Sequence, residues 1–346
     1  MTRVLVTGGA GFIGRELVAR LCDRGDEVVV LDREAAGVDA RAELVHGDLA
    51  DPAVCAAAVR GVDVVSHQAA RVGLGKDPSD LPLYAADNDL GTARLLSALW
   101  ASGFSGRLVL ASSMVVYGEG RYRCPQHGET RPAGRRPDDL DAGRFEVPCP
   151  ACASPMAWER VPESAPFDPR SGYAATKAAQ EHLTSAWARE VGASVVALRY
   201  HNVYGPGLPR DTPSAGVAAL FLSSLLRGEA PTVFEDGGQT RDFVHVADVA
   251  AANLLALGAP DAAPPGQLVP LNVCSGRAVT ILEVAETLSR VVQGPAPVVT
   301  GRWRPGDVRH VVADPAAATD VLGFQAAVGL DEGLAELAGV PSASGS

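Results

Sequence analysis

The sequence lacks an excess of positive charge. Its 346 residues include 30 Lys and Arg against 41 Asp and Glu, which gives a formal net charge of −11. Binding to DNA or RNA depends on basic patches that neutralise phosphates, so this balance argues against a nucleic-acid partner. An anionic ligand would have to be bound by a local cluster of positive charge.

Long apolar runs are also missing. No stretch approaches 18 apolar residues without a charge, so the sequence predicts no membrane partner. The N-terminal MTRVLVTGGAGFIG enters a predicted strand at once and leaves no room for a signal peptide. We therefore expect a cytoplasmic location, where disulfides are disfavoured. Three of the six cysteines stand alone and are predicted to be packed thiols: Cys22, Cys55 and Cys274.

What is present is an alternation of strand and helix signals. Short apolar runs bounded by turn residues, typical of strands buried on both faces of a parallel sheet, lie at 3–8, 27–32, 42–47, 62–70, 106–113 and 194–200. Helical patterns lie between them, at 12–25, 51–61, 91–103 and 171–192. The order predicts an α/β, doubly wound parallel sheet of the Rossmann type over 1–200, interrupted by an insert at 118–168. Residues 201–340 are predicted to form mainly a smaller α+β substrate lobe, with some chain returning to the first domain.

The stretch TGGAGFIG follows the first strand and opens the first helix. Its glycines, Gly8, Gly11 and Gly14, allow a tight turn and a close approach of a pyrophosphate to the N-terminus of a helix. Asp32 ends the second strand, where it can bind ribose hydroxyls and repel a 2′-phosphate, which favours NAD over NADP. Arg33 complicates this choice, because an arginine there can accommodate a phosphate. The GDL at 47–49 is placed to flank the adenine ring with Asp48 and Leu49.

A Tyr and a Lys four residues apart, Tyr173 and Lys177, lie on one face of a predicted helix. A protonated Lys177 would lower the pKa of Tyr173, so that the tyrosinate could take a proton from a sugar hydroxyl. Ser113, at the end of the fifth strand, could hydrogen-bond the same hydroxyl. Taken alone, Tyr173 could equally be a half-buried aromatic residue.

These segments, with HQAA (67–70), DNDLGTARLL (87–96), SSMVVYG, LRYHNVYGP (198–206), RDFVHVADVA (241–250) and RPGDVRH (304–310), resemble the extended short-chain dehydrogenases/reductases of the NAD-dependent epimerase/dehydratase group. That group acts on nucleotide sugars, and the resemblance covers nearly all of the chain. Besides the turn, Asp32, Arg33, Asp48, Leu49, Tyr173 and Lys177, it implies the following NAD-binding residues: Phe12, Ile13, Gln68, Ala69, Ala70 and Asn88.

The resemblance also implies residues that hold a nucleotide-diphosphate sugar. Asn202 and Arg241 would bind the diphosphate, and Arg304 and Asp307 would contact the nucleoside. The alternative for Arg241 is a surface salt bridge with a neighbouring aspartate, and for Arg304 a solvated position in a loop. Relatives often dimerise through the helices that carry GTARLLSALW and YAATK, so a homodimer is expected.

The residues after Ser113 narrow the reaction. Dehydratases and decarboxylases of the group carry acidic residues there, whereas this chain has Met114 and Val115, which cannot transfer protons. This favours a 4-epimerase that oxidises C4, lets the 4-keto sugar rotate and reduces it again. A 4-keto-sugar reductase and a non-catalytic dinucleotide-binding relative are the alternatives. The layout around the insert resembles dTDP-L-rhamnose 4-epimerases, with UDP-glucose and UDP-glucuronate also open as substrates.

The insert carries two pairs of metal-binding residues. Cys124 and His127 in RYRCPQHGET are three positions apart, as are Cys149 and Cys152 in PCPACASP, with 21 residues (128–148) between the pairs. Such pairs form tetrahedral zinc sites, and four protein ligands make the metal structural. The alternatives are an incidental, disordered loop and a redox role for Cys149 and Cys152. We expect a structural zinc that compensates for a missing core, with the insert at the mouth of the sugar pocket or at a subunit contact.

Overall fold

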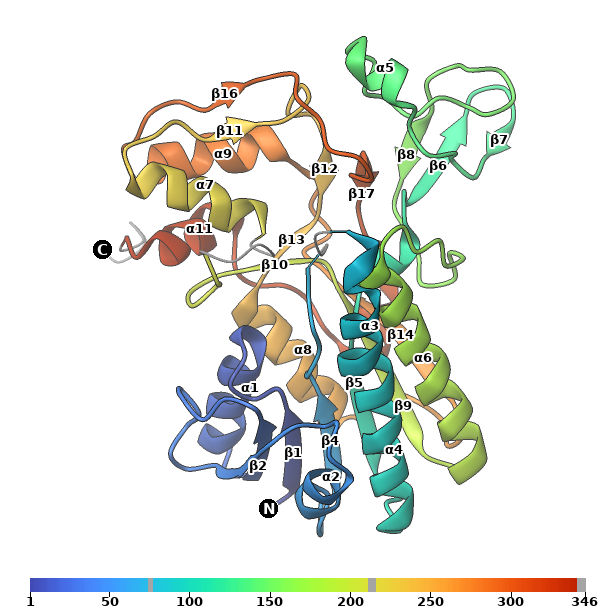
Figure 1. The fold of residues 1–346 in the computed structure, drawn as a ribbon, viewed down its shortest axis with the longest axis vertical. Coiled ribbons are helices and arrows are strands. Elements are labelled where there is room, and N and C mark those ends of the chain that lie inside the picture. Colours follow the sequence, from blue (N-terminus) through green and yellow to red (C-terminus); the bar gives the residue numbers. More distant parts are fainter. Residues whose placement is uncertain (74–76, 211–215, 341–346) are drawn as a thin grey trace.

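The computed structural model describes residues 1–73, 77–210 and 216–340 (Figure 1). The strands are β1 (Arg3–Thr7), β2 (Glu27–Asp32), β3 (Glu43–His46), β4 (Val64–His67), β5 (Arg107–Ser113), β6 (Arg121–Cys124), β7 (Gly128–Glu129), β8 (Ala157–Glu159), β9 (Ser194–Tyr200), β10 (Asn202–Tyr204), β11 (Thr232–Val233), β12 (Thr240–Arg241), β13 (Phe243–His245), β14 (Leu268–Val273), β15 (Val279–Thr280), β16 (Val298–Val299) and β17 (His310–Val311). The α-helices are α1 (Phe12–Asp23), α2 (Pro52–Ala58), α3 (Leu81–Tyr84), α4 (Gly91–Ala101), α5 (Pro137–Asp141), α6 (Gly172–Val191), α7 (Val217–Leu226), α8 (Val246–Gly258), α9 (Ile281–Val291), α10 (Ala316–Leu322) and α11 (Leu330–Ala338). Short 3-10 or π-helical turns are η1 (Pro78–Asp80), η2 (Ala85–Leu90) and η3 (Met114–Tyr117).

A seven-stranded parallel sheet has the strand order β14-β9-β5-β4-β1-β2-β3. This order confirms the predicted doubly wound sheet. From β1 the chain adds β2 and β3 toward one edge, and from β4 it adds β5, β9 and β14 toward the other edge. The sheet is completed by β14, which comes from the C-terminal part of the chain. The predicted domain bounds, 1–200 and 201–340, stay a prediction.

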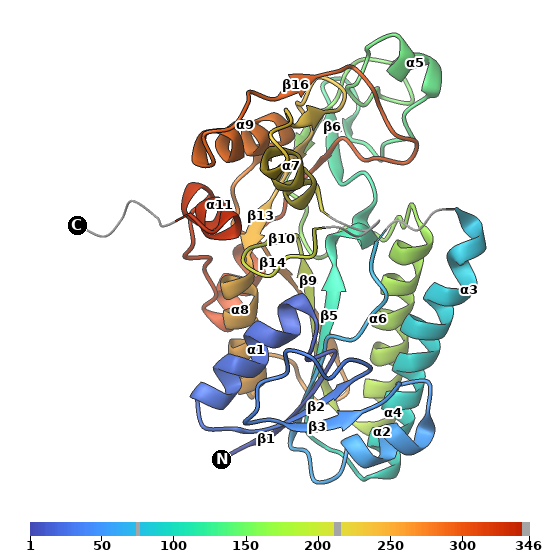
Figure 2. The same cartoon turned by 60° about the vertical axis from the view of Figure 1, so that its left-hand side comes forward.

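Alternate residues of each strand enter two separate hydrophobic cores, one on each face of the sheet. Val4 and Val6 pack with α1, α8 and α10, whereas Leu5 packs with α2, α4 and α6. Figure 2 shows α1 and α8 on one side of the sheet and α2, α4 and α6 on the other. Burial on both faces explains why the strands are continuous apolar runs in the sequence. Cys55 and Cys274 are buried as predicted, and Cys22 is only partly buried.

A second lobe lies beyond the carboxyl ends of the sheet strands (Figure 1). Its core is formed mainly by α7, α9 and α11. Short strands pair as β10-β13, β11-β16 and β15-β12-β17. In the described parts of the chain no helix combines the length and the apolar character that a membrane crossing requires.

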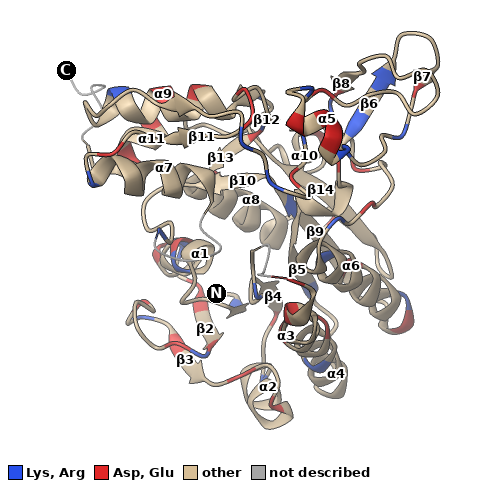
Figure 3. Cartoon of the chain, turned by 45° about the horizontal axis from the view of Figure 1, so that its top comes forward, with Lys and Arg blue, Asp and Glu red and all other residues tan. Residues whose placement is uncertain are grey.

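The insert forms a small sheet of its own, with the order β7-β6-β8. The prediction that it lacks a core was wrong, because Tyr122, Val147 and Met156 are buried around Cys124 and Cys149. Figure 3 shows that β6 is basic and α5 acidic. Short strands and a core of so few residues gave no clear periodicity in the sequence. The insert lies beside β12 and β17 of the second lobe rather than on the sheet (Figure 1).

Candidate active site and metal cluster

The glycine-rich turn between β1 and α1 opens onto a cavity of about 450 Å³. Gly8 has a φ of +71°, a conformation that favours glycine. A Cβ atom on Gly14 would lie 2.1 Å from the Gly8 carbonyl oxygen, so a side chain there would displace the turn. The cavity is lined by Gly8, Ala10, Gly11, Leu31, Asp32, Arg33, Glu34, Gly47, Asp48, Leu49, Gln68, Ala69, Ala70, Arg71, Val72 and Asp87.

The acidic residues in this cavity hold the turn and neutralise Arg33. The Asp32 carboxylate accepts hydrogen bonds from the backbone N–H groups of Ala10 (2.9 Å) and Glu34 (3.0 Å). Arg33 forms ion pairs with Asp48 (2.8 Å) and Asp87 (2.7 Å). The hydrogen bond with Asp87 is the main reason that the pKa of Arg33 is raised. Its charge is therefore already paired, which reduces its value as a partner for a 2′-phosphate.

Several residues predicted to bind the cofactor do not line this cavity: Phe12, Ile13, Gly14, Asn88, Tyr173 and Lys177. Asn88 is fully buried. Its side-chain oxygen accepts from the Arg71 backbone N–H (2.7 Å), and its side-chain nitrogen donates to the Arg71 carbonyl (3.0 Å) and to the Thr176 hydroxyl (2.9 Å). It joins η2 to α6. Sequence reasoning missed Arg71 as a lining residue, although Asp87, its ion-pair partner at 2.7 Å, lies in the recognised DNDLGTARLL.

The three predicted catalytic residues meet between β5 and α6. Ser113 is the last residue of β5, and Ser171 caps the N-terminus of α6, placing Tyr173 in its first turn. The side chains of Ser113 and Tyr173 are close enough for the Ser113 hydroxyl to affect the pKa of the Tyr173 phenol. Lys177 Nζ lies 6.0 Å from the centre of the Tyr173 ring and donates to the Ala111 carbonyl at 2.8 Å.

The pKa of Tyr173 is raised, not lowered as the sequence predicted. Burial raises the pKa of Tyr173 to about 12, although the nearby Ser113 hydroxyl lowers it in part. Burial also lowers the pKa of Lys177 to about 8, against the opposing effect of Glu181. The desolvation of both groups was not visible in the sequence.

Tyr173 lines a second, larger cavity of about 1030 Å³ between the sheet and the second lobe. Met114 and Val115 line it at the same end. Its other lining residues are Gly73, Gly118, Arg170, Ser171, Ala174, Asn202, Arg210, Gly216, Val217, Leu220, Phe221, Ser223, Ser224, Arg227, Thr232, Phe234, Gln239, Arg241, Ile281, Arg304, Gly306, Asp307 and Val308. All four predicted substrate-binding residues are therefore in one cavity.

Asn202 and Arg241 present polar groups to this cavity. The Asn202 side-chain oxygen is buried and finds no hydrogen-bond partner among the described residues. Arg241 donates to the carbonyl oxygens of Thr240 (2.9 Å), Arg309 (2.8 Å) and Val308 (2.5 Å), and burial lowers its pKa. Arg241 therefore does not form the surface salt bridge with a neighbouring aspartate that was the alternative.

The far end of the cavity is formed by the loop that contains Arg304 and Asp307. The Arg304 guanidinium lies 4.7 Å from the centre of the Phe234 ring, and burial raises the pKa of Asp307. Arg304 is thus stacked on an aromatic ring rather than merely solvated. Sequence reasoning missed Phe234, as well as Arg170 and Arg210, because none of them belongs to a recognised motif.

The four predicted metal ligands come together in the insert. The ligand atoms of Cys124, His127, Cys149 and Cys152 all lie within 4.8 Å of one another. The Cys124 sulfur is 3.4 Å from His127 Nδ1 and 3.6 Å from the Cys152 sulfur, and the Cys149 sulfur is 3.6 Å from His127 Nδ1. A tetrahedral zinc ion, with bonds of about 2.3 Å to sulfur and about 2.0 Å to nitrogen, separates its ligands by roughly 3.5–3.8 Å.

A glycine-rich turn at a helix N-terminus, two adjoining cavities and a Ser–Tyr–Lys set define a dinucleotide-dependent enzyme with a Rossmann fold. The chain belongs to the NAD dependent epimerase/dehydratase family, whose model matches residues 4–137 and 151–274. The gap between the two matched stretches, residues 138–150, lies in the insert.

Curated and solved relatives agree with this assignment. The chain is 33% identical to the dTDP-L-rhamnose 4-epimerase of Burkholderia thailandensis, over 97% of this chain and 93% of that protein. Among solved structures it is similar to the UDP-glucose 4-epimerase of Thermus thermophilus in complex with NAD, with a TM-score of 0.78, 33% identity and coverage of 97% and 98% of the two chains. It is also similar to MoeE5 in complex with UDP-glucuronic acid and NAD, with a TM-score of 0.77, 33% identity and coverage of 97% and 98%.

Proposed function

We propose that this protein is an NAD-dependent nucleotide-sugar 4-epimerase. The observation that carries the proposal is the position of Tyr173, which is close to Ser113 and lines the larger cavity together with the apolar Met114 and Val115. A proton-transfer group thus faces the cavity with no second acid or base at the two positions that follow Ser113. Such a site can oxidise and reduce a sugar carbon, but Met114 and Val115 cannot assist elimination or decarboxylation.

The smaller cavity fits NAD. Gly11, the N-cap of α1, lines this cavity where a pyrophosphate would approach the helix N-terminus, and Gly8 and Gly14 allow the tight turn because side chains there would clash with neighbouring backbone. Asp32 lies in this cavity, where its carboxylate would bind ribose hydroxyls and repel a phosphate. NAD, when bound, accepts a hydride from C4 of the sugar and later gives it back. We propose that it stays bound throughout turnover.

Tyr173 would take the proton of the C4 hydroxyl and return it when the carbon is reduced. Ser113 would hydrogen-bond the same oxygen and orient it. Burial raises the pKa of Tyr173 to about 12, which favours the protonated phenol at neutral pH. The protonated Lys177 and the positive charge of bound NAD would both favour the tyrosinate, since each is an opposite charge in a poorly solvated site.

The larger cavity would hold a nucleotide-diphosphate sugar. Arg241 supplies positive charge, and Asn202 has an unused acceptor that a sugar or ribose hydroxyl could bond. Its volume of about 1030 Å³ leaves room for the 4-keto sugar to turn over before it is reduced on the other face. The similar proteins act on dTDP-L-rhamnose or UDP-glucose or bind UDP-glucuronic acid, so these three form the first substrate set.

The test is inversion at C4 without added cofactor. Purified protein is incubated with dTDP-L-rhamnose, UDP-glucose and UDP-glucuronate in turn, and the products are resolved by NMR. One of them is expected to reach an equilibrium mixture of C4 epimers with no net NADH formed. Net consumption of NADPH with a 4-keto sugar, and no inversion, would establish the reductase instead.

We also propose that Cys124, His127, Cys149 and Cys152 hold a structural zinc ion. Three of the distances between ligand atoms, the sulfur–nitrogen and sulfur–sulfur contacts given above, are 3.4–3.6 Å, which is close to the separation in a tetrahedral site. Cys124 and Cys149 are buried, so their thiolates would be costly without a cation. Four protein ligands leave no position for a substrate, which makes the ion structural.

We propose a homodimer formed through α4 and α6. Leu90 just before α4, Trp100 on α4 and Leu183 on α6 are apolar side chains with exposed fractions of 46%, 67% and 36%. The two helices pack against each other on the same side of the sheet (Figure 2). Sedimentation of Trp100→Glu, compared with the unaltered protein, tests this surface. A dimer that survives the substitution contradicts it.

A further inference from the structure

Arg135 differs from the other arginines of the insert. Arg121 and Arg123 pair with glutamates of the insert's own sheet, and Arg136 forms a surface pair with Asp138. Arg135 instead points into the second lobe, and its side chain is only 3% exposed. A buried arginine that leaves its own segment needs partners of matching charge elsewhere.

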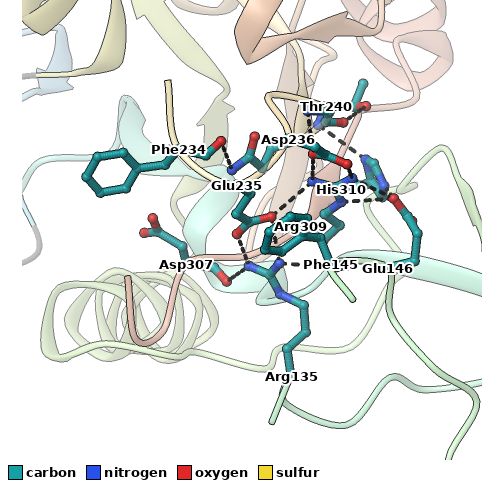
Figure 4. A network of polar contacts seen from close by, with 12 residues as sticks. Arg135, Phe145, Glu146, Phe234, Glu235, Asp236, Thr240, Asp307, Arg309 and His310 are labelled. Atoms are coloured by element: carbon teal, nitrogen blue, oxygen red, sulfur yellow. Dashed lines mark hydrogen bonds and ion pairs between the residues drawn. The ribbon is translucent and has the colours of Figure 1, made fainter. Parts of the chain in front are cut away.

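Those partners are Glu235 and the backbone of the 302–309 loop (Figure 4). Arg135 donates to Glu235 at 2.9 Å and is within 2.9 Å of its second oxygen. It also donates to the Asp307 carbonyl at 2.6 Å, and to that of Phe145 in its own segment at 3.2 Å. One guanidinium thus fixes two segments that are more than 60 residues apart in the chain.

Both segments form the wall of the substrate cavity. Phe234, which precedes Glu235, lines the cavity and carries the Arg304 guanidinium on its ring, and Asp307 lines it directly. Glu235 has a φ of +53°, which is strained for a residue with a Cβ atom. Its backbone N–H donates to the Arg302 carbonyl at 2.6 Å, which joins the two segments again. Fixing Glu235 therefore fixes the wall behind it.

A second contact supports the same arrangement. Glu146 of the insert accepts from Arg309 at 2.6 Å and contacts His310 at 3.1 Å, and Arg309 also bonds Glu235 at 2.9 Å (Figure 4). Arg309 is buried, so Glu235 keeps one cation if Arg135 is removed. Loss of Arg135 is then expected to loosen the wall rather than unfold the lobe.

The Cys/His cluster joins the two ends of the segment that carries Arg135. His127 and Cys149 close the ends of the stretch 128–148, which contains Arg135 and Glu146. Apart from the two residues of β7 and the short helix α5, this stretch is a long loop, and the entropy it would gain without a crosslink opposes its docking.

We propose that Arg135 is a positioning residue for the nucleotide end of the substrate cavity, and that the metal cluster maintains this contact. The role of Arg135 rests on the proposed function, because that function places a nucleotide-diphosphate sugar in the cavity. Arg135 touches neither the substrate nor the reacting atoms. It acts through Phe234, Arg304 and Asp307.

The test measures binding of UDP and dTDP by calorimetry, so it does not depend on turnover. Arg135→Met is expected to raise the Kd of the nucleotide that the wild type binds by about tenfold, and to raise KM with kcat within about threefold. Arg135→Lys should recover part of the affinity, because it restores the charge but not the two-pronged contact. Arg136→Met, the exposed neighbour, is the matched control and should match the wild type. The Kd for NAD should be unchanged in all three, which also shows that the variants are folded.

Metal removal by Cys149→Ser should weaken nucleotide binding in the same way, and add little in the Arg135→Met background. Wild-type Kd and KM in Arg135→Met would refute the positioning role while leaving the epimerase intact. Nucleotide binding without C4 inversion would refute the proposed function and still leave Arg135 tested. A wild type that binds neither UDP nor dTDP would refute both, and unchanged affinity after metal loss would refute the role of the cluster.

Discussion

The sheet and the insert are stabilised by different interactions. The seven strands are buried between two hydrophobic cores, whereas the insert has one small core, a Cys/His cluster and a set of ion pairs that reach into the second lobe. The stability of the sheet therefore depends mainly on the burial of apolar side chains. The insert depends on a few specific polar contacts, so conditions that remove a metal or a charge should affect it first.

The largest effect is expected in the sheet-borne site, from Tyr173→Phe. The substitution removes the proton-transfer group, so turnover should fall by at least about a thousandfold, while NAD and nucleotide binding persist. The measurement is kcat for C4 inversion with the identified sugar. Tyr204→Phe, which removes a buried hydroxyl bonded to Gly329, is the control and should retain activity. Full turnover in Tyr173→Phe contradicts the assignment of the base.

Cys149→Ser tests whether the insert and the sheet are stabilised independently of each other. The wild type should contain about one zinc per chain by elemental analysis, and the variant should lose it. Backbone amides of 118–168 should then exchange hydrogen faster by at least about tenfold, while those of β1, β4 and β5 keep their protection. Cys22→Ser, outside the cluster, should keep both metal and protection. Equal loss of protection in sheet and insert would show that the two regions are not independently stabilised.

A more local effect, confined to cofactor choice, is expected at the cofactor cavity from Asp32→Ala. Without the carboxylate the repulsion of a 2′-phosphate disappears, so the ratio of NADP to NAD affinity should rise about ten- to a hundredfold. Calorimetry with both dinucleotides measures this. Asp39→Ala, which removes a surface partner of Arg41, is the control. A wild-type preference for NADP would overturn the role given to Asp32.

The smallest effect concerns stability, and here the substitution, Lys177→Met, should stabilise the fold. Burial lowers the pKa of Lys177 from 10.5 to about 8, which costs the fold roughly 3 kcal/mol when the group is charged. Lys177→Met also loses the hydrogen bond to Ala111, worth about 1–2 kcal/mol, so it should raise the free energy of unfolding at pH 7 by about 1–2 kcal/mol.

The pH dependence checks the cause. Between pH 8 and 10.5 the unfolded chain binds a proton at Lys177 that the folded chain does not, so the stability of the wild type rises with pH there. The advantage of Lys177→Met should therefore shrink across that window in urea unfolding. An advantage that is constant with pH would assign the effect to packing.

The fold could be predicted because its signals are local. Val28, Val29 and Val30 form an apolar run between turns, and Asp51, the first residue of the helical pattern predicted at 51–61, caps the helix by accepting the Ala53 N–H at 2.8 Å. The turn around Gly8 was recognised for the same reason, since its backbone geometry depends on neighbouring residues.

Other features depend on distant contacts and could not be predicted. Arg135 and Arg136 are adjacent and identical in type, yet one is buried against Glu235 and the other is solvated. The pKa of Tyr173 was predicted in the wrong direction because desolvation depends on everything packed around the ring. Phe234 forms part of the cavity only because the lobe brings it there.

The position of β14 in the sheet has a consequence for synthesis on the ribosome. Val273 of β14 pairs with Tyr200 of β9, 73 positions earlier in the chain (273 − 200), and the lobe strands β10–β13 lie between them. At roughly 5–20 residues per second, β9 would wait about 4–15 s for its partner after leaving the ribosome. During that interval a flat, apolar edge containing Val195 and Val196 is open to pairing with another chain. Nascent chains stalled in the lobe should therefore be held by chaperones or aggregate, whereas chains stalled beyond β14 should not.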